Sequence, residues 1–213
     1  MRTLLTLMKR EIIDHVAYFV GAAAFSGLMI LVMASAILGM EGRELENVAV
    51  GGSIPLVLVA VVGLCGLGVA QMYTDRTRKI SALLIVLPTT RWQIFVARVA
   101  AGLLAILILV IPLAIAGTIL IDMHAGEVPL YAGVLGDVLR SVFLVCFACY
   151  AVGLYAGWDR RSLTPTLGVL PVVMLIPLLV IIKGFGLEVA GILLVFIAAC
   201  LAATWCRFSS SPL

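Results

Sequence analysis

Long apolar stretches alternate with short polar segments along this chain. The apolar stretches predict membrane-spanning helices at about 17–38, 54–72, 92–121, 138–157, 165–182 and 189–206. A bilayer hydrocarbon core of roughly 30 Å requires about 20 apolar residues in a helix. The pattern therefore predicts an all-α integral membrane protein, in which a six-span domain covers residues 17–207 and a polar tail follows at 208–213.

Residues 1–16 show a different pattern, because apolar and charged positions alternate with helical spacing. The apolar positions are Leu4, Leu5, Met8, Ile12 and Val16, and the polar ones between them are Arg2, Thr6, Lys9, Arg10 and Asp14. Such a segment is too polar to span a membrane, but its two faces suit the boundary between lipid and water. We expect an amphipathic helix that lies in the membrane interface.

Small residues and prolines modify the predicted spans. Small side chains let a neighbouring helix approach closely, and they occur at Gly21–Ala24, Ser26–Gly27, Gly63, Gly66, Gly68, Gly153 and Gly157. Pro112 predicts a kink in the third span, while Pro171 and Pro177 predict that the fifth is interrupted. Residues 40–53 are predicted to form an acidic loop, and Lys183–Glu188 a tight reversal.

The polar segment at 73–91 contains a short amphipathic helix by pattern. Asp75 is placed to cap its start, and Pro88 to end it. Its apolar face is formed by Ile80, Leu83, Leu84 and Leu87. Thr90 and Gln93 have the spacing of a capping box, which predicts the start of the next helix.

Composition and charge support a membrane location. The chain is 64% hydrophobic and 12% charged, whereas soluble domains are about 45–50% apolar and about 25% charged. With both termini on the cytoplasmic side, 11 of the 14 basic residues are cytoplasmic, as the positive-inside rule requires. They are Arg2, Lys9, Arg10, Arg76, Arg78, Lys79, Arg91, Arg98, Arg160, Arg161 and Arg207. The other three, Arg43, Arg140 and Lys183, are then external.

The sequence lacks the motifs of common catalytic sites. It has no phosphate-binding loop, no HExxH and no GxSxG. Asp122, His124 and Glu127 are interpreted as a solvated loop, and the cysteines as small hydrophobes within the spans. Charged residues inside a span usually mark ion pathways, and none occurs near the centre of a predicted span. Because the basic residues flank apolar stretches, a nucleic-acid partner is not expected.

Two segments resemble the permease subunit of ABC-2 type ATP-binding-cassette transporters. MKREIIDH at 8–15 is similar to the basic interfacial helix that opens many such permeases. The run from Tyr73-Thr-Asp-Arg76 through Lys79-Ile-Ser-Ala-Leu-Leu84 to Leu87-Pro-Thr-Thr-Arg91 is similar to the family's cytoplasmic loop. The chain departs from the pattern at Lys79-Ile-Ser81, where the family often has Gly-Thr, and in its short final reversal.

The resemblance implies that residues 73–91 form a coupling helix that contacts a separate ATPase. The contact residues would be Asp75, Arg76, Lys79, Ile80, Leu83, Leu84, Leu87 and Arg91. The expected assembly contains two ATPase subunits and a second permease, identical or related, in a bacterial cytoplasmic membrane. This chain would be a non-enzymatic export subunit without a cofactor, and ATP and Mg would bind the partner. A signalling or anchoring role beside an ATPase, and a membrane-embedded enzyme, remain as alternatives.

Overall fold

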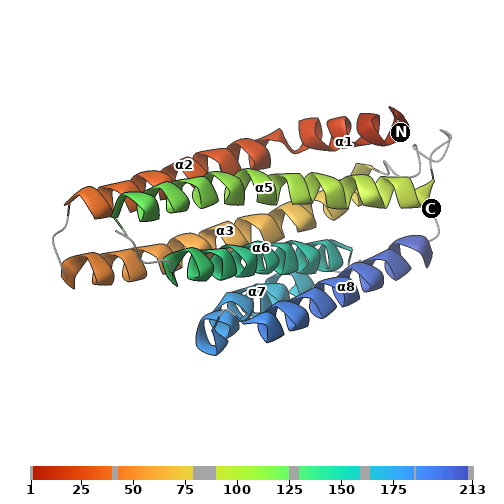
Figure 1. Cartoon of the computed structure of the whole chain (residues 1–213). Helices are drawn as coiled ribbons and strands as arrows, with labels where there is room; N and C mark the ends of the chain where they lie inside the picture. The colour runs from red at the N-terminus through yellow and green to blue at the C-terminus, as the bar shows by residue number, and fades with distance from the viewer. Residues whose placement is uncertain are drawn as a thin grey trace.

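The computed structural model describes residues 2–39, 43–78, 90–124, 130–158, 164–184 and 186–210. Within these ranges the regular elements are all α-helices, so the predicted helical class is confirmed. The helices are α1 (Arg2–Asp14), α2 (Val16–Gly39), α3 (Arg43–Arg78), α5 (Arg91–His124), α6 (Leu130–Gly157), α7 (Thr164–Lys183) and α8 (Leu187–Ser210). They lie side by side in an elongated bundle (Figure 1).

Helices α3 and α5 are the longest, with 36 and 34 residues. At 1.5 Å per residue each is about 50 Å long, which exceeds a hydrocarbon core of roughly 30 Å. The predicted acidic loop at 40–53 is therefore wrong from Arg43 onward. Its Glu and Leu residues favour a helix, and two glycines cost only about 1 kcal/mol each relative to alanine. The sequence predicts a long third apolar helix, and α5 confirms that length.

Several helices are long and apolar enough to cross a membrane. Four segments of the described residues qualify: Val57–Thr74, Arg91–Ile119, Gly136–Gly157 and Leu187–Ser210. A fifth arises if Leu5–Asp14 and Val16–Val32, which meet at a bend of 73°, are counted as one. Gly168–Lys183 in α7 is a shorter apolar helix. The chain is thus a helical protein with several candidate spans, consistent with a multi-pass membrane protein.

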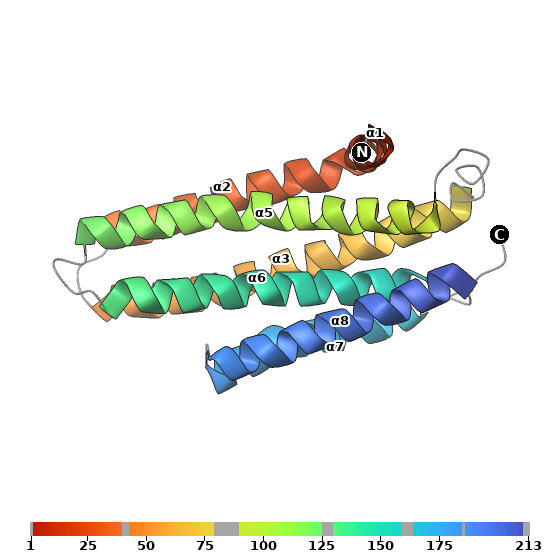
Figure 2. The ribbon, with the colours of Figure 1, turned by 45° about the vertical axis from the view of Figure 1, so that its right-hand side comes forward.

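The ends of the helices alternate along the bundle. The end of α3, the start of α5 and the end of α8 lie at one end, and the first turns of α1 lie toward it (Figures 1 and 2). The end of α5 and the start of α6 lie at the opposite end (Figure 2). We call these the α3–α5 end and the α5–α6 end.

Helix α6 forms the centre of the bundle, where it packs against α3, α5, α7 and α8. Its second half is almost completely buried, including Tyr150 and Leu154, which are both 0% exposed. Close approach to α3 depends on glycines: a Cβ on Gly68 would lie 2.6 Å from the Tyr150 carbonyl oxygen, and one on Gly153 would overlap the Cys65 carbonyl. The predicted close packing is therefore confirmed at this contact.

Other small residues do not meet a neighbouring helix. A Cβ on Gly21, Gly27 or Gly63 would find no heavy atom of the described chain within 4 Å. Gly21 and Gly63 instead line an apolar cavity of about 210 Å³ between α2, α3 and α5. The prediction of close packing within this chain is wrong at these positions, because the space that a glycine leaves there is part of a cavity or is open, and no neighbouring helix fills it.

Helix α7 continues through both of its prolines. Pro171 and Pro177 lie inside Thr164–Lys183, so the prediction of an interrupted span is wrong. The reversal after it is confirmed, since α7 ends at Lys183 and α8 begins at Leu187. Gly184 has a φ of 85° and its N–H donates to the Val180 carbonyl over 2.9 Å. This left-handed conformation favours glycine and ends the helix.

Candidate functional site

The predicted coupling segment is only partly covered by the described residues. Lys79, Ile80, Leu83, Leu84 and Leu87 lie outside them. Asp75 and Arg76 lie in the last turns of α3, which continues to Arg78. The prediction that Asp75 caps a new helix is therefore wrong, because α3 does not end before it.

The start of α5 is built as the sequence predicts. The Thr90 N–H donates to Gln93 Oε1 over 3.2 Å, and the Gln93 N–H donates to Thr90 Oγ1 over 3.3 Å. This reciprocal pair is a capping box. Next to it, Arg91 Nη1 donates to the Ser209 carbonyl over 2.6 Å. Arg91, predicted as an ATPase contact, thus joins the start of α5 to the last turn of α8.

Two turns into α5, Arg98 makes a buried ion pair that sequence reasoning missed. Its Nε lies 3.2 Å from Glu11 Oε1 on α1, and the two side chains are 1% and 18% exposed. Arg98 Nη1 lies 3.7 Å from Met72 Sδ on α3, and the guanidinium carbon lies 5.7 Å from the centre of the Phe208 ring on α8. One side chain therefore connects four helices.

Tyr150 extends this network into α6. Its hydroxyl lies 2.7 Å from Gln71 Oε1 and 3.0 Å from the Arg98 carbonyl. The hydroxyl carries one proton, so it cannot donate fully to both acceptors. A Gln71 amide turned by 180° would donate to the Tyr150 oxygen and free that proton for the Arg98 carbonyl. The same turn would pair Gln71 Nε2, which is buried and has no hydrogen-bond partner among the described residues.

The bend between α1 and α2 lies beside the network. Here the His15 N–H donates to the Glu11 carbonyl over 3.1 Å, and the Tyr18 N–H donates to the His15 carbonyl over 2.9 Å. His15 is 6% exposed, and its Nδ1 lies 3.7 Å from Glu11 Oε2. Glu11 thus holds both the bend of its own helix and Arg98 of α5.

These contacts show which face of α1 packs on the bundle. Leu7 is buried, and Met8 and Ile12 pack against the core, whereas Leu5 and Val16 are 64% and 54% exposed. The face that packs on the bundle includes the polar Glu11. Helical spacing places Glu11 at the edge of the apolar face, where a charged side chain is normally expected to be solvated, so the sequence does not predict its burial.

The network encloses little free space. A cavity of about 10 Å³ lies between Glu11, His15, Gln71, Thr74 and Arg98. That volume holds about one water molecule and no larger substrate. The network is therefore a connection between helices, and it is not a binding pocket for a metabolite.

Aromatic side chains surround the same end of the bundle. The Trp92 and Trp205 rings are 5.1 Å apart, and Trp158 and Phe208 are 5.5 Å apart. Arg207 lies over the Tyr155 ring at 4.3 Å and donates to its hydroxyl over 2.7 Å. Tryptophan and basic residues concentrate at membrane interfaces, so this end has the composition of one.

The interpretation of Asp122 and His124 as part of a solvated loop is wrong, because both are helical. Asp122 and His124 belong to the last turn of α5, and Glu127 lies outside the described residues. Comparison with known proteins gives no further assignment, since no protein-family model, curated protein or solved structure matches the chain.

Proposed function

We propose that the chain is the membrane subunit of an ABC-2 type exporter, driven by ATP that a separate subunit hydrolyses. The proposed topology has six spans, with α7 as the fifth, and both termini in the cytoplasm of a bacterial cell. The basic residues support this orientation because most of them belong to the α3–α5 end. The amphipathic α1 would then lie along the cytoplasmic interface.

One observation carries the proposal. Residues 79–89 connect the end of α3 to the start of α5, and both helices are joined to the rest of the bundle within about two turns of that connection. Arg91 reaches α8, Arg98 reaches α1, and Tyr150 on α6 reaches Gln71 on α3. A force applied to residues 79–89 would therefore move several helices together.

This arrangement suits a coupling element. In the proposed mechanism, two ATPase subunits bind ATP and Mg, and each receives a 73–91 segment from one of two membrane subunits. The apolar face of Ile80, Leu83, Leu84 and Leu87 would lie in a groove of the ATPase. Closure of the ATPases would shift α3 and α5, and the polar network would pass that shift to α1 and α6.

The test is a matched pair of acidic substitutions in the proposed coupling helix. Leu84 lies on its apolar face and Ile85 about 150° away from the centre of that face, by helical spacing. Leu84→Asp would bury an unpaired carboxylate in the contact, at a cost of 3 kcal/mol or more. We expect a loss of ATPase affinity on the order of 100-fold, while Ile85→Asp retains binding.

The measurement is recovery of a nucleotide-hydrolysing subunit with the tagged chain, together with ATP hydrolysis by the complex in liposomes. Insertion of both variants is checked by membrane fractionation. An ATPase that binds Leu84→Asp as well as the unaltered chain would refute the coupling face. A chain that is active without any ATPase would refute the proposed function itself.

A further inference from the structure

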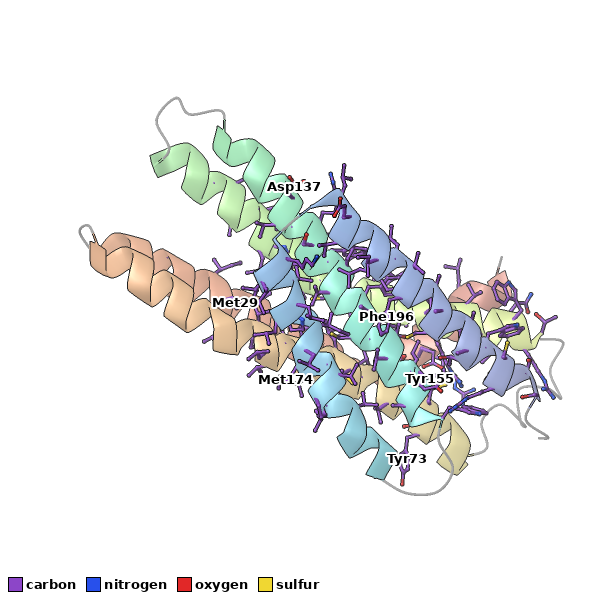
Figure 3. The ribbon with its side chains drawn as sticks, turned by 90° about the horizontal axis from the view of Figure 1, so that it is seen from below. Met29, Tyr73, Asp137, Tyr155, Met174 and Phe196 are labelled. Atoms are coloured by element: carbon purple, nitrogen blue, oxygen red, sulfur yellow. The ribbon has the colours of Figure 1, made fainter. Side chains whose placement is uncertain are left out.

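A large apolar cavity lies between α3, α6 and α7. Its volume is about 520 Å³, and its walls come from the segments 57–61, 138–146 and 174–181. The segments from α3 and α6 lie near the middle of their helices, and the segment from α7 lies in its second half. Figure 3 shows this region between the labelled Met174 on α7 and Asp137 on α6.

The cavity has the size and chemistry of a binding site for an apolar group. Pockets for small molecules are typically about 300–1,000 Å³. Ser141, which is 4% exposed, supplies a hydroxyl, and the remaining lining side chains are Val, Leu, Ile, Met, Pro and Cys. Apolar cavities exclude water, so a hydrocarbon ligand that fills this cavity would lower the free energy of the protein.

The cavity is open toward the outer surface of α7. Leu175, Leu178 and Ile181 line it, yet each is at least half exposed. The walls from α3 and α6 belong to the candidate spans Val57–Thr74 and Gly136–Gly157. At that depth the surrounding medium is lipid, so a ligand enters sideways from the bilayer.

Basic residues lie close in sequence to the cavity lining on α6 and α7. Arg140 precedes Ser141 on α6, and Lys183 lies two residues beyond Ile181 on α7. Arg140 also pairs with Asp137 at 3.6 Å, but both side chains are more than half exposed, and such pairs contribute little. A basic residue close in sequence to the lining on each of two helices would suit the phosphate of a phospholipid, and the apolar cavity would suit its acyl chain.

We propose that this cavity binds one acyl chain of a phospholipid, with the lipid phosphate near Arg140 and Lys183. The site is separate from the Glu11–Arg98–Tyr150 network and does not depend on an ATPase partner. Bound lipid would fill the space between α7 and the α3–α6 pair.

The first test measures lipid that remains with the purified full chain. Phospholipid per chain is quantified by native mass spectrometry after extensive detergent exchange, which removes loosely associated lipid. We expect about one retained molecule per chain in the unaltered protein. Ser141→Phe, which fills the cavity, should lose it, whereas Leu179→Phe, on the lipid-facing side of α7 and outside the cavity, should retain it.

A second test does not require a bulky substitution at a buried position such as Ser141. Leu178 lines the cavity and is 51% exposed, while Leu179 does not line it and is 56% exposed. Trp is introduced at each position, and its fluorescence is measured in vesicles with increasing fractions of phosphatidylglycerol carrying brominated acyl chains. Quenching at Leu178→Trp should saturate at a low brominated fraction, whereas quenching at Leu179→Trp should rise in proportion to that fraction.

The headgroup is tested in the same vesicles with phosphatidylglycerol and phosphatidylcholine. Arg140→Gln should raise the brominated fraction needed for saturation severalfold. Three results would overturn the proposal: no lipid retained by the unaltered chain, equal retention by Ser141→Phe, or identical quenching curves at positions 178 and 179. Retention lost in a stable dimer would show that a second copy of the chain covers the cavity instead.

Discussion

The ion pair between Glu11 and Arg98 joins α1 to α5, and its energy can be worked from its burial. Removing one partner from a buried pair costs about 3–5 kcal/mol, because the other charge stays buried without it. Glu11 is 18% exposed and Arg98 1%, which favours the lower end of that range. We expect Glu11→Leu to lower the free energy of unfolding by about 3 kcal/mol.

A double-mutant cycle separates the pair from its surroundings. Arg98→Met leaves the Glu11 carboxylate without its cation, and it should also destabilise the protein. Replacing both partners removes both desolvated charges, so the double variant should lose less than the sum of the single ones. The expected coupling energy is about 2–3 kcal/mol.

The assay is reversible unfolding in mixed micelles by increasing dodecyl sulfate, followed by helix content and tryptophan fluorescence. Asp14 supplies a matched control on the same helix. It pairs with Arg10 at 3.6 Å, with side chains 34% and 42% exposed, and exposed pairs contribute about 0–1 kcal/mol. Asp14→Leu should therefore change the unfolding free energy by no more than about 0.5 kcal/mol.

The cycle has a clear negative outcome. A coupling energy below about 0.5 kcal/mol would mean that Glu11 and Arg98 act independently. If Glu11→Leu and Asp14→Leu lowered the free energy of unfolding equally, the loss would not depend on which acidic residue of α1 is removed. Burial of the Glu11–Arg98 pair would then not be the cause of its stabilising effect. Either result would remove the polar network as the connection between α1 and α5.

Two further substitutions test the contacts of α6. Gly153→Ala places a methyl group against the Cys65 carbonyl on α3 and should destabilise the protein by at least about 2 kcal/mol. The control is Gly21→Ala, whose methyl group meets no neighbour among the described residues and should stabilise the protein by up to about 1 kcal/mol. Equal effects of the two substitutions in thermal unfolding would contradict the close α3–α6 contact. Tyr150→Phe removes the hydroxyl that bonds Gln71 and should lower the free energy of unfolding by about 1–3 kcal/mol. The dodecyl sulfate titration measures this loss. An unchanged midpoint would show that the hydroxyl makes no net contribution to stability.

The sequence predicts local features of this fold well and distant pairings poorly. The capping box at Thr90 and Gln93 and the reversal at Gly184 follow from residues a few positions apart. Glu11 and Arg98 are 87 residues apart, and each alone has the pattern of a solvated charge. Their burial depends on how α1 turns at His15, which no local spacing specifies.

Glycines show the same limit. Gly63 and Gly68 lie on one helix and both predict a close neighbour, yet a Cβ meets one only at Gly68. The two positions differ by 500° around the helix, or 140° after whole turns. They therefore face different directions, and only the packing of α3 decides which of them meets α6.

The two features on which the proposals rest lie nine residues apart on α6. Tyr150 holds the polar network and Ser141 lines the apolar cavity, and they are separated by about 14 Å along one helix. The glycine contact makes α3 and α6 a closely packed pair, so a shift at the α3–α5 end is carried along both helices. Helix α7 closes the cavity through apolar side chains, many of them half exposed. Apolar contacts are not directional, so we expect α7 to be the wall of the cavity that moves most easily when α3 and α6 shift. A lipid bound in the cavity would then determine where α7 lies.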